Sequence, residues 1–198
     1  RGKGYMTELL HHAIMEMRRI GYPISWLGGD RQRYNSFGWE LASPLYDLQF
    51  SRRSLEWHGI EPVQIEEVMP EEALPVIEKF QARQACHTIR PDLARQVQIM
   101  DKRFWIFSDG YAILAGQARR ELRILELVST GGHELGVIRA LLDWNFGDRA
   151  SWGLSMWDGE RIGRLMRCVS YWSGGSSAMY RINDLAQVLD AARPVLSA

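Results

Sequence analysis

The chain opens with Arg1-Gly2-Lys3-Gly4-Tyr5-Met6 and continues at once into Thr7-Glu8-Leu9-Leu10. Glycines let backbone N–H groups converge, a helix N-terminus adds partial positive charge, and two basic side chains add full charges. The stretch therefore predicts an anion site, for which a pyrophosphate is a natural ligand. A frayed, charged terminus would have the same composition, so the surrounding sequence must distinguish the two interpretations.

A helix is predicted directly after this opening. Its apolar residues recur at the spacing of one helical face: Met6, Leu9, Leu10, Ala13, Ile14 and Met17. Gly21 and Pro23 are typical of a helix end. The elements expected next are a buried strand over 24–27, a short helix from Asp30 to Phe37 closed by Gly38, and one long strand or bent hairpin arm over 48–57.

Residues 62–182 predict a longer succession: strand, helix, helix, strand, strand, strand, helix, strand, helix, strand. The expected strands are 63–68, 104–107, 111–114, 124–128, 152–156 and 178–182, and the expected helices are 70–84, one from Pro91, one around 135–142, 159–169, and a last one capped by Asp184. Asp109-Gly110 predicts an antiparallel hairpin between two of the strands.

The four elements of residues 5–57 match the last four of this succession. The economical interpretation is an internal repeat whose first copy lacks its front half. Half a mixed sheet cannot bury both faces of its strands, which favours a truncated first copy. The predicted fold class is α/β (α+β in some schemes), with mixed twisted sheets and flanking helices.

The opening stretch resembles the pyrophosphate-binding loop of the GNAT superfamily of N-acetyltransferases. That pattern is Gln or Arg, two residues, Gly, one residue, then Gly or Ala; Arg1 and Gly4 match it, and Met6 departs from it. Together with Tyr34-Asn35-Ser36-Phe37-Gly38-Trp39, the loop is similar to the branch related to the mycobacterial enhanced-intracellular-survival acetyltransferase. That branch tolerates a large aliphatic residue at the end of the loop.

The resemblance implies a domain plan. Members of the branch join an active GNAT domain, a second GNAT domain without a working cofactor loop, and a sterol-carrier-like domain. On this plan residues 1–60 form the C-terminal half of a cofactor-binding GNAT domain, 61–183 a second GNAT-like domain, and 184–198 the start of a third domain. The chain is then expected to be a fragment, and whether it is active by itself is left open.

The resemblance also implies a reaction. We expect acetyl transfer from acetyl-CoA to a primary amine of a small molecule or peptide, with Arg1, Gly2, Lys3, Gly4, Tyr5 and Met6 holding the cofactor. Tyr34 is expected to protonate the departing thiolate, because a phenol with a pKa of about 10 stays protonated at neutral pH. A packing aromatic is the alternative for Tyr34. The general base is expected to lie outside this chain.

The second repeat differs at the equivalent place. It offers Leu127-Val128-Ser129-Thr130-Gly131-Gly132, with no basic residue and its glycines out of register. A plain strand-to-helix turn is expected there, not a second acyl-CoA site. His133 precedes a helix and is expected to have a capping or surface role. A non-catalytic interaction module with the same fold is the alternative function for the chain.

Composition limits the partners. Of the 198 residues, 24 are Lys or Arg and 24 are Asp or Glu, so no net field favours nucleic acid or an anionic membrane. No apolar run approaches the roughly 20 residues that cross a bilayer. The two cysteines show no metal-ligand spacing, which favours reduced thiols, a cytoplasmic protein and no metal. A homo-oligomer is left open.

Overall fold

The structure, a computed structural model, describes residues 3–83, 102–115 and 121–196. It divides into two compact units. Unit 1 is Arg1–Leu45 together with Gly175–Ala198, and unit 2 is Tyr46–Gly174. The predicted boundaries near residues 60 and 183 divide the chain by repeat copy, and they stay a prediction. The helix expected from Pro91 lies outside the described residues.

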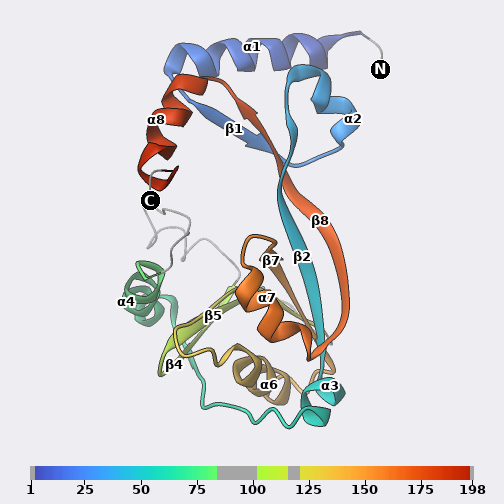
Figure 1. The fold of residues 1–198 in the computed structure, drawn as a ribbon, viewed down its shortest axis with the longest axis vertical. Helices are drawn as coiled ribbons and strands as arrows, with labels where there is room; N and C mark the ends of the chain where they lie inside the picture. Colours follow the sequence, from blue (N-terminus) through green and yellow to red (C-terminus); the bar gives the residue numbers. More distant parts are fainter. Residues whose placement is uncertain (1–2, 84–101, 116–120, 197–198) are drawn as a thin grey trace. The chain divides into compact units, whose positions relative to one another are not determined.

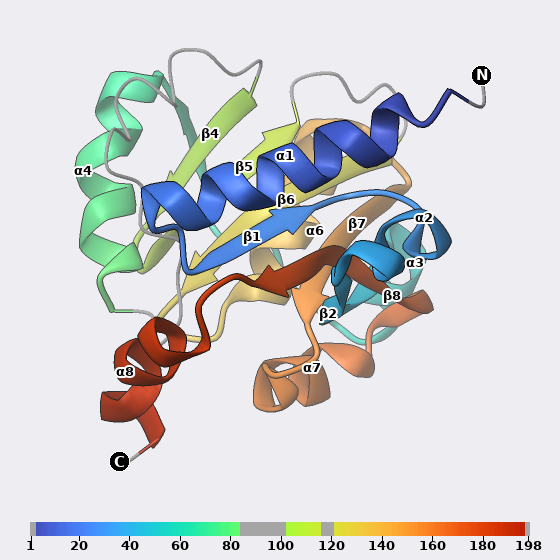
Figure 2. The same ribbon diagram turned by 90° about the horizontal axis from the view of Figure 1, so that it is seen from above.

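Unit 1 begins with helix α1 (Tyr5–Ile20), which ends where the sequence predicted. Gly21 adopts φ 88°, a left-handed conformation that favours glycine, and its N–H donates to the carbonyls of Met17 and Arg18 at 3.1 Å. Strand β1 (Ile24–Leu27) follows and runs alongside α1 in both views (Figures 1 and 2). Both elements were predicted, and both are confirmed.

A short helical segment comes next in unit 1. It consists of α2 (Arg31–Tyr34) and the 3₁₀ turn η1 (Asn35–Phe37). Asp30 caps it as predicted, since its carboxylate accepts from the N–H of Gln32 at 3.0 Å. The small core of unit 1 lies between this segment, α1 and the strands: Ile14, Trp39 and Met179 are buried, and Leu10, Met17, Leu27, Tyr34 and Phe37 pack against them.

The next segment corrects a prediction. Strand β2 (Glu40–Ser51) starts earlier than expected, and residues 52–57 are not a strand but helix α3 (Arg52–Trp57). The Ser51 hydroxyl accepts from the N–H of Ser54 at 3.1 Å, which begins the helix. Leu55 on this helix is fully buried in the core of unit 2. A serine cap and tertiary burial therefore outweigh the aromatic, strand-like composition.

Unit 2 is a mixed sheet with helices on both faces. Its elements are β3 (Glu66–Val68), α4 (Pro70–Gln81), β4 (Lys102–Phe107), β5 (Gly110–Ala115), β6 (Glu121–Ser129), α6 (Glu134–Trp144), β7 (Arg149–Ser155) and α7 (Gly159–Met166). Strands β3 to β6 pair antiparallel in sequence order, and β6 pairs parallel with β7. This is the mixed sheet with flanking helices that the sequence predicted (Figure 1).

Alternation along β4 and β5 explains the two faces. Phe104, Tyr111 and Ile113 pack with Ile77 and Phe80 of α4, whereas their neighbours in sequence belong to the cluster that contains α6. Those neighbours are Trp105, Ala112 and Leu114. Because successive side chains point to opposite faces, a strand covered on both sides is apolar throughout.

The predicted hairpin is confirmed, with one shift. Phe104 pairs with Ile113 and Phe107 with Gly110, so Ser108 and Asp109 form the turn and Gly110 is the first residue of β5. Gly110 is needed because the backbone of β5 passes close to that of β6 at this point, and not because of the turn. A Cβ there would lie 1.8 Å from the carbonyl oxygen of Val128 on β6.

Two long strands are shared by the units. Strand β8 (Val169–Ile182) begins in unit 2 and ends in unit 1, and β2 runs through both as well. In unit 1 the strand order is β1-β8-β2, with Ile24 opposite Ile182 and Trp26 opposite Tyr180 in the antiparallel β1·β8 pair. In unit 2 the order is β8-β2-β7-β6-β5-β4-β3. Helix α8 (Leu185–Leu196) follows and is capped by Asp184, as predicted.

One carboxylate fastens the β4–β5 turn of unit 2 to the loop before α6. Asp109 accepts from the Ser129 hydroxyl and the Gly131 N–H, both at 2.6 Å, and one of its oxygens lies 3.1 Å from Nδ1 of His133. Burial raises the pKa of Asp109, but the hydrogen bonds from Ser129, His133 and Gly131 outweigh it and bring the pKa below its usual value. The folded state therefore favours the charged form.

We predict that Asp109→Asn lowers the free energy of unfolding at pH 7 by about 1–3 kcal/mol, since it removes hydrogen bonds to a charged, largely buried acceptor. The Asp109 carboxylate stabilises the fold fully above its ordinary pKa, and this contribution is lost as pH falls below it. The difference in the free energy of unfolding between the native protein and the variant should therefore become smaller at acidic pH. Urea denaturation measures this difference. The control is Asp190→Asn, which removes one partner of an exposed ion pair on α8. Equal stabilities at pH 7 would contradict the assigned role.

Candidate functional site

The first backbone N–H groups of α1 have no acceptor within the helix. Gly4 is the N-cap residue in a left-handed conformation, with φ 74°, and its carbonyl accepts from the N–H of Glu8 at 3.2 Å. No side chain caps the helix. Helix geometry therefore leaves the N–H groups of Tyr5, Met6 and Thr7 without an intrahelical partner. These groups, at the positive end of the helix dipole, suit an anion.

The described residues of the predicted loop are exposed to solvent. Arg1 and Gly2 lie outside the described residues. Lys3, Gly4, Tyr5 and Met6 are all exposed, so a ligand could reach the loop. Glu8 in the first turn is an exposed negative charge that opposes the positive charge of Lys3. The N–H groups and Lys3 are thus the described features that could hold a phosphate.

Tyr34 lies on α2, half-buried in the core of unit 1. Tyr34 and Phe37 both pack against the buried cluster of unit 1. Phe37 in turn contacts the ring of His11 on α1 edge-on, with centroids 5.3 Å apart. Among the described residues no partner accepts or donates a hydrogen bond at the Tyr34 hydroxyl. Within the described part of the chain, Tyr34 is therefore held by the packing of its ring.

Sequence reasoning missed the residues around Tyr34. Glu40, Arg31 and Asn35 form a hydrogen-bonded group beside it, and the guanidinium of Arg181 on β8 donates to the carbonyl of Phe37 at 2.9 Å. Burial, with the nearby positive charge of Arg18, lowers the pKa of Arg181. Arg31 and Glu40 are nine residues apart, and Arg181 comes from the far end of the sequence, so only the folded chain brings them together.

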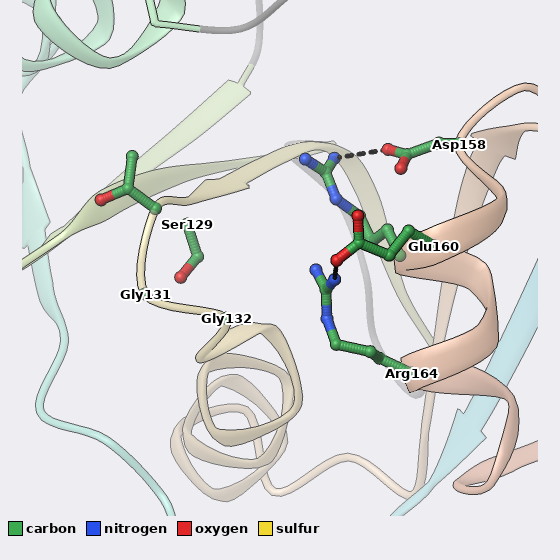
Figure 3. A pocket seen from close by; sticks show the side chains of 8 residues that line it. Ser129, Gly131, Gly132, Asp158, Glu160 and Arg164 are labelled. Atoms are coloured by element: carbon green, nitrogen blue, oxygen red, sulfur yellow. Dashed lines mark hydrogen bonds and ion pairs between the residues drawn. The ribbon is translucent and has the colours of Figure 1, made fainter.

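Unit 2 has a cavity of about 550 Å³ beside the turn between β6 and α6. One wall is the loop of Ser129, Thr130, Gly131 and Gly132, and the other is α7 (Figure 3). Arg164 extends from α7 toward the cavity and pairs with Glu160 at 2.9 Å, and Arg161 pairs with Asp158 at 3.2 Å. Each of the two guanidinium groups already has a carboxylate partner.

The loop that lines this cavity also makes hydrogen bonds within the protein. Asp109 accepts the Gly131 N–H and the Ser129 hydroxyl, so an internal carboxylate lies where a loop of this kind would bind an external anion. His133 pairs with the same carboxylate, which agrees with a structural role for that histidine. The Gly131 N–H and the arginines of the cavity thus have carboxylate partners within the protein.

No group of three or more His, Cys, Asp or Glu side chains is arranged to hold a metal ion in the part of the chain that the structure describes. Within the same residues, every helix is too short or too polar to span a bilayer.

The fold has known counterparts. Comparison with protein-family models and with curated protein sequences gives no match. A GCN5-related N-acetyltransferase from Kribbella flavida superposes with a TM-score of 0.67 at 19% identity, over 93% of this chain and 50% of that one. A protein of unknown function from Enterococcus faecalis, described as a probable N-acyltransferase, gives 0.74 at 15%, over 96% and 53%.

Eis1 from Mycobacterium abscessus superposes with a TM-score of 0.64 at 17% identity, over 96% of this chain and 55% of that one. The chain thus spans about half the length of each of these three proteins. At such identities the likeness establishes the fold: a mixed α/β arrangement of the kind found in GCN5-related N-acetyltransferases.

Proposed function

We propose that the protein is an N-acetyltransferase of the enhanced-intracellular-survival type, which transfers an acetyl group from acetyl-CoA to a primary amine. The observation that carries this proposal is the uncapped start of α1. A left-handed Gly4 precedes N–H groups that have no partner within the helix, Lys3 lies beside them in sequence, and the fold is one in which N-acetyltransferases occur.

The residues present fit the phosphates of acetyl-CoA. The N–H groups of Tyr5, Met6 and Thr7 would donate to phosphate oxygens, and Lys3 would add a full positive charge. A Cβ at Gly4 would meet no atom within 4 Å, so the loop backbone is open to an approaching ligand. Arg1 and Gly2 would extend the same loop. Acetyl-CoA supplies the thioester; the loop holds and orients it.

Tyr34 is the residue to which we assign the proton transfer. The amine attacks the thioester carbonyl directly, and backbone donors polarise that carbonyl. As the carbon–sulfur bond breaks, the Tyr34 hydroxyl donates its proton to the departing thiolate. Its ring is held by the core of unit 1, and its hydroxyl has no competing partner among the described residues. The general base is not assigned to this chain.

The acceptor is a primary amine of a small molecule or peptide, because an unprotonated amine is the nucleophile that this reaction requires. Balanced charge argues against nucleic acid or an anionic membrane as the partner. We propose a cytoplasmic location, which fits a reduced thiol at Cys168: burial raises the pKa of this thiol and favours its protonated form. No metal is needed.

A specific observation favours a different role for unit 2. Its loop donors are held by Asp109, and its cavity arginines by Asp158 and Glu160. We infer a non-catalytic scaffold, which supports the strands that it shares with unit 1. This role does not compete with catalysis in unit 1.

Binding is the first test of the proposal. Calorimetry with acetyl-CoA should give saturable heat, and Gly4→Ala should weaken the affinity about tenfold, because a Cβ in the left-handed region costs roughly 1–2 kcal/mol. Gly153→Ala is the matched control, since Gly153 also has open space around it but an ordinary φ. Absence of saturable heat with the native protein would contradict the proposal and favour a non-catalytic interaction module.

Turnover is the second test. Tyr34→Phe keeps the packing of the ring and removes only the proton, so kcat for acetyl transfer should fall by roughly 10²–10⁴. The affinity for acetyl-CoA should barely change, because the loop near Gly4 holds the phosphates. Steady-state kinetics separate the two quantities. Unchanged kcat would return Tyr34 to a packing role, and a large loss of affinity with normal kcat would make it a binding residue.

A further inference from the structure

The segment that carries Tyr34 is too short to hold itself in place. Helix α2 has four residues and η1 has three. Helix nucleation is unfavourable, and short helices need outside contacts to persist. The position of the Tyr34 hydroxyl therefore depends on what fastens this segment to the rest of unit 1.

Glu40, the first residue of β2, makes most of these attachments. Its carboxylate accepts from Nε and Nη2 of Arg31 at 2.5 and 2.6 Å, from Nδ2 of Asn35 at 2.7 Å, and from the N–H of Leu41 at 2.8 Å. A carboxylate has about four acceptor positions, so this one is fully used. The Arg31 pair is bidentate, the geometry that fixes orientation as well as distance.

The two side chains that Glu40 binds bracket Tyr34. Arg31 precedes it by three residues and Asn35 follows it directly, so both ends of its helical turn are fastened to one carboxylate. We infer that Glu40 is a positioning residue, which holds the Tyr34 hydroxyl in place for proton donation in the proposed reaction. This inference rests on the proposed function of Tyr34.

Contacts on the other side of the ring leave it little freedom. A Cβ at Gly29 would lie 2.7 Å from Cε2 of Tyr34, so the ring packs directly over the backbone there. Gly29 itself has φ 150°, a conformation that other residues rarely adopt. The backbone at Gly29 limits the movement of the Tyr34 ring, and the hydrogen bonds to Glu40 limit the movement of the turn that carries it.

Glu40 stays charged throughout the useful pH range. Hydrogen bonds from Arg31 first, and from the Leu41 N–H, lower the pKa of Glu40 from 4.5 to about 2. The attachment is therefore complete above pH 4.5 and is lost only as pH falls toward 2. Replacing Glu40 should therefore lower kcat by the same factor at every pH from 6 to 9, without moving the pH profile.

The test compares Glu40→Gln with Glu16→Gln. Glu16 makes a similar exposed, bidentate pair with Arg19 on α1, at 2.5 and 2.9 Å, but does not touch the Tyr34 segment. We expect Glu40→Gln to lower kcat by roughly tenfold to a hundredfold, as small misplacements of a catalytic group do. The KM for acetyl-CoA should not change. Glu16→Gln should leave both at the native values, and Arg31→Glu with Glu40→Arg should recover much of kcat.

Two further measurements separate the inference from the proposed function. In Glu40→Gln with Tyr34→Phe, kcat should equal that of Tyr34→Phe alone, because Glu40 acts through the phenol. Independently of activity, NMR of ¹³C-labelled tyrosine should show the Tyr34 ring resonances shifted in Glu40→Gln and unshifted in Glu16→Gln. Unmoved resonances, or native kcat in Glu40→Gln while Tyr34→Phe is impaired, would overturn the inference. Native kcat in Tyr34→Phe would overturn the proposed function, and the inference with it.

Discussion

Neither compact unit of this chain is complete without a strand from the other half of the sequence. β1 pairs with the end of β8, and β2 follows β7 in the strand order of unit 2, so strands from distant parts of the sequence complete each unit. Leu48 and Phe50 on β2 are fully buried in unit 2, and Met179 on β8 is buried in unit 1. Because such pairs close long loops, their formation carries an entropic cost that burial in the core must offset.

A partly buried arginine links β2 to the helices of unit 2. Arg52, at the junction of β2 and α3, donates to the carbonyls of Leu142 and Gly147 at the end of α6 and pairs with Asp143. Helix ends leave carbonyls without partners, and a cation there satisfies them and complements the helix dipole. Arg52 thus links the end of β2 to the end of α6.

Periodicity predicted most elements because it depends on near neighbours. The hairpin of β4 and β5, the faces of α1 and α6, and the caps at Asp30 and Asp184 all follow from short patterns. The failures have physical causes. Residues 169–177 are rich in serine and glycine and resemble a loop, yet they belong to β8, where the Ser170 and Ser176 hydroxyls donate to carbonyls of β2.

Some residues of the candidate site could be predicted from short motifs, and others could not. The loop at residues 1–6 and Tyr34 were predicted from short motifs, and Gly4 at the start of α1 adopts a left-handed conformation. Glu40 and Arg181 carry no motif, and Asp109 was read only as a hairpin signal. Their roles depend on partners that the fold brings close, so a pattern of near neighbours could not reveal them.

The most direct test of the account is a crystal structure of the protein with acetyl-CoA. We predict that the pyrophosphate lies against the N–H groups of Tyr5, Met6 and Thr7, with the Tyr34 hydroxyl within hydrogen-bond distance of the sulfur. A cofactor bound instead to the Gly131–Gly132 loop of unit 2, or a sulfur remote from Tyr34, would contradict it.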